Sequence, residues 1–253
     1  MATVIQTDNL AVSFDGVTPV FEGLTLAIEK GEFVSLVGVS GAGKSTLLRV
    51  IADLIPAFKG SVRVDTPSDP TRRAIAMVFQ AANLMPWRSV EDNITLGLEG
   101  IDVSDRLKKE RVRWTLDLVG LGNYADRWPY QLSGGQQQRI GIARALAVDP
   151  DILLMDEPFG SLDAITRNAL QDELLHIWKE TGKSILFVTH DIEEAVYLGD
   201  RVLLLGGEPA HIINEYSIGI ERTERRESEA FLRKVEKVRG GLQDAINVTL
   251  SAH

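Results

Sequence analysis

A glycine-rich segment at residues 38–46, GVSGAGKST, has residue types that could hold a phosphate chain. It fits the pattern G-x-x-x-x-G-K-[ST] and lies between a strand-like run and an apolar helical stretch, where a phosphate loop belongs. Its glycines would let backbone N–H groups point at phosphate oxygens, Lys44 would contact the β- and γ-phosphates, and Ser45 would hold Mg²⁺. A nucleoside triphosphate is the predicted ligand, and a glycine-rich turn with a surface lysine is the weaker alternative. The predicted binding residues are Gly38, Ser40, Gly41, Ala42, Gly43, Lys44, Ser45 and Thr46.

Two adjacent carboxylates, Asp156 and Glu157, end another strand-like run, ILLMDEP. Neighbouring residues on a strand point to opposite sides, so one acid can face a metal and the other a different target. Asp156 is the natural partner of Mg²⁺, and Glu157 could orient and deprotonate the water that attacks the γ-phosphate. His190 ends the run SILFVTH and could hydrogen-bond the same phosphate. The remaining histidines, expected to be structural or exposed, are His176, His211 and His253.

The segment LSGGQQQR, residues 132–139, has the pattern of a helix start with an unusual cost. Ser133 and Gln136 have the spacing of a capping box. Gly134 and Gly135 lie between them, and each costs a helix roughly 1 kcal/mol relative to alanine. We therefore expect a group from elsewhere to approach this bare backbone.

Strand-like and helical runs alternate along the chain, which predicts an α/β fold with a largely parallel sheet. The expected strands are 32–38, 74–80, 151–157, 184–190 and 201–206. The segment from about 84 to 149 has no strong strand run and predicts a helical insertion. Within it, the helical pattern of 105–121 puts four residues on one predicted face: Leu107, Trp114, Leu118 and Leu121. A second helical pattern runs through Ile177 and Trp178 and stops at Gly182.

The C-terminal stretch, residues 221–253, is rich in charge and carries Phe231, Val235 and Val238 at helical spacing. A solvated helix packed on the edge of the domain is the favoured interpretation, and a partner-binding tail is the alternative.

The composition is that of a globular protein, with 253 residues, 44% hydrophobic residues and 25% charged residues. A net charge of −9 argues against nucleic acid as a partner. The chain has no cysteine, and we found no metal site made of protein ligands alone. Since no apolar run reaches the roughly 18 residues of a membrane span, we expect a soluble, cytosolic protein that only a partner could hold at a membrane.

Five motifs now stand in order along the chain: GVSGAGKST, LSGGQQQR, ILLMDEP, SLD and VTH. With them the sequence resembles the ATP-binding subunit of an ABC transporter, from about residue 9 to about residue 215. The resemblance implies a P-loop ATPase with a RecA-like, mostly parallel sheet, an antiparallel β edge and an inserted helical subdomain, with ATP and Mg²⁺ bound. It also implies a nucleotide-binding core of residues 1–83 and 150–220, a helical subdomain of residues 84–149 and a C-terminal helical extension of residues 221–253.

Further residue roles are implied by the resemblance alone. Phe14 would stack on adenine, and Gln80 would contact both the metal site and the membrane partner. In the family, two identical or closely related cassettes pack head to tail, and the signature segment of one contacts the γ-phosphate held by the other. Asp163 would lie at the contact between the two cassettes. The signature residues are Ser133, Gly134, Gly135 and Gln136.

A narrower likeness, in NLMPWRSVEDNITLGLEG and in the stretch from DEPFGSLD to VLLL, points to importers of nitrate, sulfonates, taurine and related solutes. The expected partners are transmembrane permease subunits and, indirectly, a periplasmic or extracellular solute-binding protein. The chain would then lie on the inner face of the membrane. In that branch, residues 84–88 lie near the permease, although Leu84 and Trp87 could instead fill the core of the helical subdomain. The alternative function is a non-transport ABC ATPase that acts in assembly or scaffolding.

Overall fold

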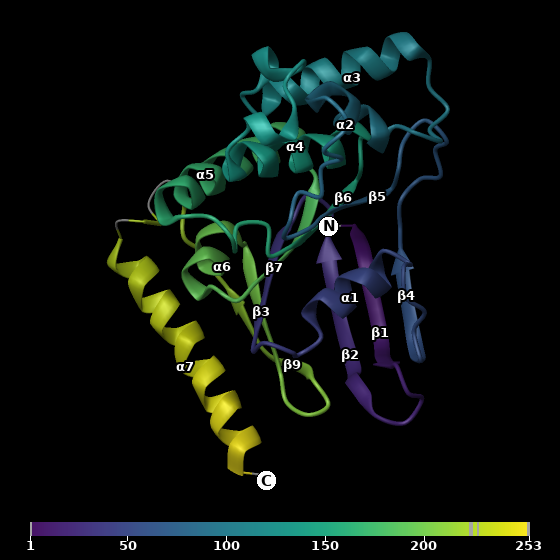
Figure 1. Cartoon of the computed structure of the whole chain (residues 1–253). Coiled ribbons are helices and arrows are strands. Elements are labelled where there is room, and N and C mark those ends of the chain that lie inside the picture. The colour runs from purple at the N-terminus through teal and green to yellow at the C-terminus, as the bar shows by residue number, and fades with distance from the viewer. Residues whose placement is uncertain (1, 223–224, 227, 252–253) are drawn as a thin grey trace. The chain divides into compact units, whose positions relative to one another are not determined.

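A computed structural model describes residues 2–222, 225–226 and 228–251 (Figure 1). The chain forms two compact units, one of Met1–Asp65 with Ser184–His253 and one of Thr66–Lys183. The predicted subdomain boundaries at 83/84, 149/150 and 220/221 differ from these unit boundaries and stay a prediction. Within the described ranges, no helix has both the length and the hydropathy needed to cross a bilayer.

The first unit contains a run of mainly parallel strands, in which β3 lies between β7 and β8. Every residue of β3 and β7 is buried, as expected for strands covered on both faces. This arrangement confirms three of the predicted strands. A further strand, β9, pairs antiparallel with β8. It was not predicted, because most of its residues are polar and it contains no continuous apolar run. The strands are β3 (Phe33–Gly38), β7 (Ser184–Thr189), β8 (Arg201–Gly206) and β9 (His211–Ser217).

An antiparallel sheet completes the strands of this unit, in the order β2-β1-β4. Its strands are β1 (Thr3–Ser13), β2 (Pro19–Glu29) and β4 (Lys59–Val64). None of these three strands was among those predicted from apolar runs in the sequence. The antiparallel β edge that the resemblance implied is confirmed.

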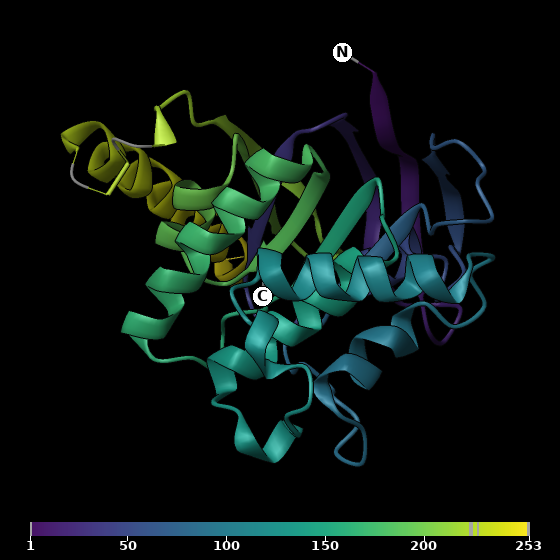
Figure 2. The same ribbon diagram turned by 90° about the horizontal axis from the view of Figure 1, so that it is seen from above.

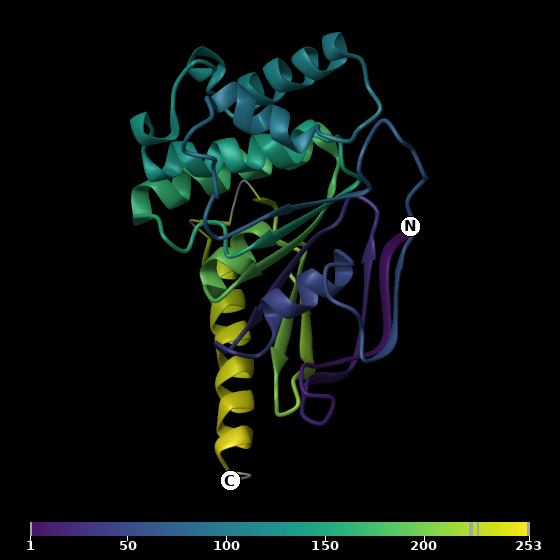
Figure 3. The same cartoon turned by 45° about the vertical axis from the view of Figure 1, so that its right-hand side comes forward.

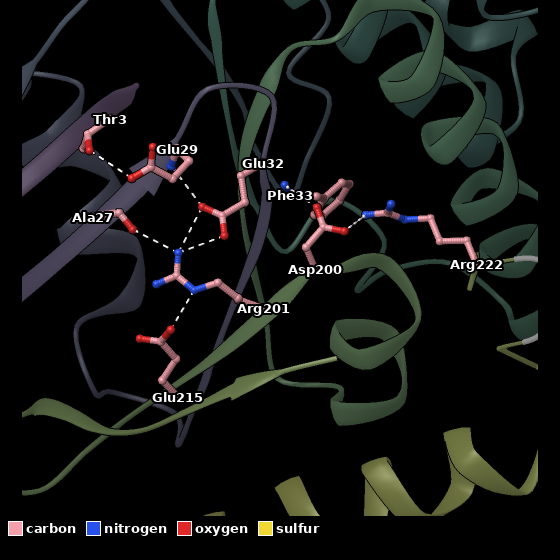
Figure 4. Close-up of polar contacts among 9 residues, drawn as sticks. All are labelled: Thr3, Ala27, Glu29, Glu32, Phe33, Asp200, Arg201, Glu215 and Arg222. Atoms are coloured by element: carbon pink, nitrogen blue, oxygen red, sulfur yellow. Dashed lines mark hydrogen bonds and ion pairs between the residues drawn. The ribbon is translucent and has the colours of Figure 1, made fainter. Parts of the chain in front are cut away.

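Arg201, at the start of β8, joins the two groups of strands (Figure 4). Its Nη1 donates hydrogen bonds to both carboxylate oxygens of Glu32, at 2.8 and 3.0 Å, and to the carbonyl oxygen of Ala27 on β2, at 3.2 Å. Its Nε donates to Glu215 on β9, at 2.7 Å. Because Glu32 directly precedes β3, this network fixes the strand that leads into the phosphate loop.

Three helices belong to the first unit: α1 (Lys44–Ile51), α6 (Ile192–Leu198) and α7 (Glu229–Ser251). Helix α7 packs against α6, β8 and β9, and Figure 3 shows it running alongside the β8–β9 hairpin. Its residues Phe231, Val235 and Val238 are all buried, which confirms the predicted packed helix. The chain before α7 is anchored by the buried Arg225, whose Nη1 donates to three backbone carbonyl oxygens at the end of α6.

The second unit combines a parallel strand pair with helices that pack on one another (Figure 2). Its elements are β5 (Ile75–Val78), α2 (Val90–Gly97), α3 (Asp105–Leu118), η1 (Gly122–Tyr124), η2 (Pro129–Gln131), α4 (Gly134–Ala147), β6 (Ile152–Asp156) and α5 (Ala164–Thr181). Both strands and the helical character of 84–149 were predicted. The predicted stop of α5 is also confirmed, since Gly182 follows it with a left-handed φ of 61°.

The face predicted from Leu107, Trp114, Leu118 and Leu121 is only partly buried, and Leu121, which is buried, follows the end of α3. Trp114 is 49% exposed and Leu107 is 36% exposed, whereas Thr115 is fully buried with Val112 and Leu116 beside it. A threonine can occupy this position because its hydroxyl donates to the carbonyl oxygen of Arg111, at 3.0 Å, and so needs no partner outside the helix. The prediction counted only apolar residues as core. The residues that are buried lie on the adjacent face of the helix and include a threonine.

Candidate functional site

The phosphate loop runs from the end of β3 to the start of α1, within the first unit. Gly41 and Gly43 have φ angles of 85° and 84°, a conformation that residues with a side chain rarely adopt. Gly43 is also the N-cap of α1, so the first N–H groups of this helix open onto the loop. At Gly38, an added Cβ would collide with the carbonyl oxygen of Leu205 on β8. The loop therefore needs glycine for its own conformation and for its packing against the sheet.

Lys44, the first residue of α1, is 6% exposed. Its Nζ donates hydrogen bonds to the carbonyl oxygens of Gly38 and Val39, each at 2.9 Å. The loop thus wraps around the ammonium group, and the ammonium group provides a positive charge for an anion that binds there. A surface lysine on a glycine-rich turn does not fit this burial.

A cleft of about 630 Å³ opens over the loop, a volume that suits a small-molecule ligand. Its lining comes from residues 39–42 of the loop, residues 18–20 at the start of β2 and residues 207–210 between β8 and β9. The 207–210 turn is held against β2 by backbone hydrogen bonds from Ala210 N to Val20 O, at 3.2 Å, and from Glu22 N to Ala210 O, at 3.1 Å. Sequence reasoning missed this side of the cleft, because its glycine and proline indicate a turn but not what the turn lies against.

Phe14 is 69% exposed in the turn between β1 and β2, so its ring is not part of the core. Asp15 fixes this turn by accepting hydrogen bonds from the backbone N–H groups of Val17, at 2.8 Å, and Thr18, at 2.7 Å. These bonds hold the pKa of Asp15 well below its usual range. The exposed ring is available to a flat ligand group, and adenine stacking stays a prediction.

His190 is exposed and follows β7 directly. β7 pairs with β3 so that Thr189 lies opposite Val37, which places His190 at the sheet edge where the phosphate loop begins. The next residue, Asp191, caps α6 by accepting from the N–H groups of Glu193 and Glu194, at 2.9 and 3.2 Å. Helix α6 therefore begins directly after His190 and its capping neighbour. His176 and His211 are also exposed, and His253 lies outside the described residues.

The second unit carries the two predicted carboxylates at the end of β6. Asp156 is buried, at 8% exposure, and Glu157 is half-buried. Glu157 has a φ of 44°, a left-handed conformation uncommon outside glycine, asparagine and aspartate. Such strained residues gather at functional sites, where the surrounding structure holds them in place.

Gln80 and Glu157 lie at the same edge of the β5–β6 pair, since Val78 is opposite Met155. The two side chains also converge on one glycine. A Cβ added at Gly160 would lie 3.3 Å from Gln80 Nε2 and 3.7 Å from Glu157 Oε2. The structure therefore brings together two of the predicted site residues, the expected base Glu157 and the expected metal-site residue Gln80.

The loop that carries Gln80 is fastened to α4, the helix of the signature segment. Gln138 Nε2 donates to Phe79 O at 3.0 Å, and Arg144 Nη2 donates to Ala82 O at 2.6 Å. A displacement of α4 would therefore pull on the backbone at either side of Gln80.

The capping box at the start of α4 is confirmed. Ser133 Oγ accepts from Gln136 N at 3.3 Å, and Gln136 Oε1 accepts from Ser133 N at 2.9 Å. Gly134 is exposed, but Gly135 is buried, and a Cβ at Gly135 would lie 2.6 Å from Thr166 Cγ2 on α5. The group that approaches Gly135 thus comes, at least in part, from the chain itself.

Asp163 is the N-cap of α5. Its Oδ1 accepts from Ile165 N at 3.1 Å and Thr166 N at 3.0 Å, and its Oδ2 accepts from Thr166 Oγ at 2.7 Å. The hydrogen bonds from the backbone and side chain of Thr166 lower the pKa of Asp163, so the group is held as a carboxylate.

Trp87 is 70% exposed, which excludes it from the core of the helical region. The loop around it is fixed by the fully buried Asn93 on α2. Asn93 Oδ1 accepts from Met85 N at 2.7 Å, and its Nδ2 donates to the carbonyl oxygens of Arg88 and Ser89 at 3.1 and 2.9 Å. An exposed indole on a rigid loop is a feature typical of interaction surfaces.

Comparison with known proteins places the chain in a family. The model of the ABC transporter family matches residues 21–160, more than half of the chain. An aliphatic sulfonates import ATP-binding protein of Paracoccus denitrificans is 46% identical over 233 residues, covering 92% of this chain and 88% of that protein. A taurine import ATP-binding protein of Escherichia coli strain K12 is 41% identical over 224 residues, covering 87% and 86% respectively. A dimeric ATP-binding cassette, solved in a post-hydrolysis state with ADP and Pi, gives a TM-score of 0.72 at 32% identity and covers 86% of this chain and all of its own. The chain belongs to the ABC transporter family, as one of its ATP-binding subunits.

Proposed function

We propose that this subunit hydrolyses ATP to power the import of a small solute through separate permease subunits. The observation that carries the proposal is the phosphate loop, which holds the buried Lys44 at the start of α1 and whose residues 39–42 line a cleft of about 630 Å³. The relatives named for sulfonate and taurine import support a sulfonate-like or similarly small, anionic solute.

In this proposal the residues divide the chemistry of ATP hydrolysis between them. Lys44 and the backbone of the loop hold the phosphates, Glu157 orients and deprotonates the attacking water, and His190 hydrogen-bonds the γ-phosphate. The strained backbone of Glu157 and its approach to Gln80 around Gly160 support a functional site at this end of β6.

Mg²⁺ would be held by Ser45, Gln80 and Asp156 together with the phosphates of ATP. A hydroxyl, an amide oxygen and a carboxylate are the hard oxygen ligands that Mg²⁺ prefers, so the donor set fits. Within the described residues, no group of three or more acidic, histidine or cysteine side chains could hold a metal alone. When bound with the nucleotide, Mg²⁺ would neutralise phosphate charge as the bond to the leaving group breaks.

A second cassette would complete the site. Ser133 and Asp163 are exposed, and both cap helices whose N-termini attract anions. ATP bound between two such chains would hold them together, and its hydrolysis would release the contact. The permease would contact the rigid loop that presents Trp87, which would keep the subunit at the inner face of the membrane.

The test is transport in proteoliposomes that contain the subunit, its permease and a solute-binding protein. We expect ATP-dependent uptake of taurine or an alkanesulfonate, and no uptake with the Lys44→Ala variant. Uptake of nitrate alone would correct the solute class but keep the importer. If the subunit formed no complex with the permease, and its ATPase rate did not respond to any of these solutes, the import proposal would be wrong.

A further inference from the structure

The N-termini of α4 and α5 lie next to each other, and one side chain, Thr166, contacts both. Its Oγ donates to Asp163 Oδ2 at 2.7 Å, and its γ-methyl carbon lies 2.6 Å from where a Cβ on Gly135 would stand. Gly135 belongs to the signature segment, and Asp163 belongs to the SLD motif. Thirty residues or so of sequence separate the two motifs, yet a single threonine joins them.

We propose that Thr166 is a positioning residue that fixes Asp163 and the signature segment relative to each other, so that both meet a partner cassette as one surface. This inference rests on the proposed function, because it assumes that both motifs contact a second copy of the chain. Thr166 itself touches no reacting atom in this account.

The geometry of a threonine side chain makes this double contact mechanically stiff. The hydroxyl and the methyl group share one Cβ, so a single angle, χ1, sets both of their positions. Rotation that moved the methyl group away from Gly135 would also break the hydrogen bond to Asp163. Conversely, a shift of α4 toward α5 would press on the methyl group and disturb the carboxylate.

The carboxylate depends on this contact for its orientation. Asp163 accepts three hydrogen bonds from α5, and two of them come from the backbone and the hydroxyl of Thr166. The hydroxyl is the donor to Oδ2, whereas both backbone N–H groups donate to Oδ1. Removing the hydroxyl would therefore free one edge of the carboxylate while leaving the helix cap in place.

The absence of a side chain at Gly135 is what allows the other contact. Gly134 lies near Leu162 Cδ2, at 3.7 Å from an added Cβ, which is ordinary van der Waals distance. At Gly135 the corresponding space is already filled by the threonine methyl. Farther along the two helices, Arg139 Nη2 lies 2.9 Å from Glu173 Oε2, a second contact that keeps α4 and α5 in register.

Two substitutions separate the two contacts of Thr166. Thr166→Val keeps a methyl group facing Gly135 and removes the hydroxyl, whereas Thr166→Ser keeps the hydroxyl and removes the methyl. Thr181→Val is the matched control, because Thr181 also lies on α5 and its hydroxyl donates only within the helix, to Ile177 O at 2.7 Å.

The experiment measures ATP affinity, ATP-dependent dimerisation and steady-state ATPase rate for each full-length variant. We expect Thr166→Val to bind ATP as the wild type does, and its dimerisation and kcat to fall by about tenfold, as when a hydrogen bond to a charged group is lost. Because the proposal requires both contacts, Thr166→Ser should also bind ATP normally but lose part of its dimerisation and kcat, and Thr181→Val should match the wild type. Asp163→Ala should show the same loss, with no further loss in the Asp163→Ala/Thr166→Val double variant.

Wild-type dimerisation and hydrolysis by Thr166→Val would overturn this inference and leave the proposed function intact. Fully additive losses in the double variant would also overturn it, because Thr166 would then act independently of Asp163. If the wild-type chain itself neither dimerised on ATP nor hydrolysed it, the proposed function and this inference would both be wrong.

Discussion

Lys44 Nζ donates a hydrogen bond of 2.9 Å to the carbonyl oxygen of Gly38, six residues earlier, at the opposite end of the phosphate loop. The ammonium group therefore has a second role besides its charge, because it closes the loop by joining its two ends.

Replacing Lys44 with alanine should remove both the charge and this closure. We expect triphosphate affinity to fall by on the order of a hundredfold, equivalent to about 3 kcal/mol, as in other losses of a buried charge contact. Titration calorimetry with ATP measures the change, and Lys59→Ala, at an exposed lysine of the same unit, is the control. Unchanged ATP affinity in Lys44→Ala would refute the assignment of the loop.

The two signature glycines should respond differently to alanine. Gly135→Ala places a methyl 2.6 Å from Thr166 Cγ2, so the free energy of unfolding should fall by about 1–3 kcal/mol. Gly134→Ala places a methyl at ordinary van der Waals distance, 3.7 Å, from Leu162 Cδ2 and should leave stability unchanged or raise it by up to about 1 kcal/mol. Urea unfolding of the isolated subunit gives both values.

Both glycine variants should nonetheless hydrolyse ATP slowly, because a partner's nucleotide also needs the bare backbone. Gly134→Ala is the more informative of the two, since its folding is not impaired. If Gly134→Ala turned over ATP at the wild-type rate, contact with a second cassette would not be what requires a glycine there.

Trp87→Ala should leave the fold and the basal ATPase rate of the subunit unchanged, because the indole is 70% exposed. Stimulation of the ATPase by the permease complex should fall severalfold, as expected when an exposed aromatic anchor is truncated. Trp114→Ala, at another half-exposed tryptophan of the same unit, is the matched control. Equal losses in both variants would argue against a specific role for the loop at residues 84–88.

Glu173 on α5 should make stability depend on pH. Burial raises the pKa of this carboxyl to about 7, and Arg139 offsets only part of that rise. Between the ordinary pKa of about 4.3 and about 7, the folded chain keeps a proton that the unfolded chain has lost, so its free energy of unfolding falls as pH rises.

Glu173→Gln lacks this titration and serves as the reference at each pH. Relative to it, the wild type should lose about 3 kcal/mol of unfolding free energy between pH 4.5 and pH 7.5, measured by urea unfolding. A constant difference between the two proteins over this range would mean that Glu173 has the same pKa in the folded and the unfolded chain.

Local patterns were sufficient to predict the motifs and most of the elements that carry them. The strands before Gly38 and Glu157 were evident because fully buried parallel strands read as continuous apolar runs. The capping box at Ser133 was evident because its two partners are three residues apart. Such signals lie within a single window of sequence.

Contacts between distant segments could not be predicted in this way. Nothing in the signature segment indicates that Thr166 fills the space beside Gly135, or that the 207–210 turn lines the cleft over the phosphate loop. The burial of Thr115 on α3 was not predicted either, because a count of apolar residues leaves threonine out. Its hydroxyl can be buried because it donates to the backbone of its own helix. These features depend on tertiary packing, which periodicity does not encode.

In the proposed mechanism, ATP holds two of these chains together and its hydrolysis separates them. The most direct test is the oligomeric state of Glu157→Gln with ATP and Mg²⁺, followed by light scattering, with Glu180→Gln at an exposed position of α5 as the control. We expect Glu157→Gln to bind ATP normally, to accumulate as a dimer and nearly to stop hydrolysing, while Glu180→Gln behaves as the wild type. A Glu157→Gln protein that stays monomeric with bound ATP, or that hydrolyses ATP at the wild-type rate, would contradict this mechanism.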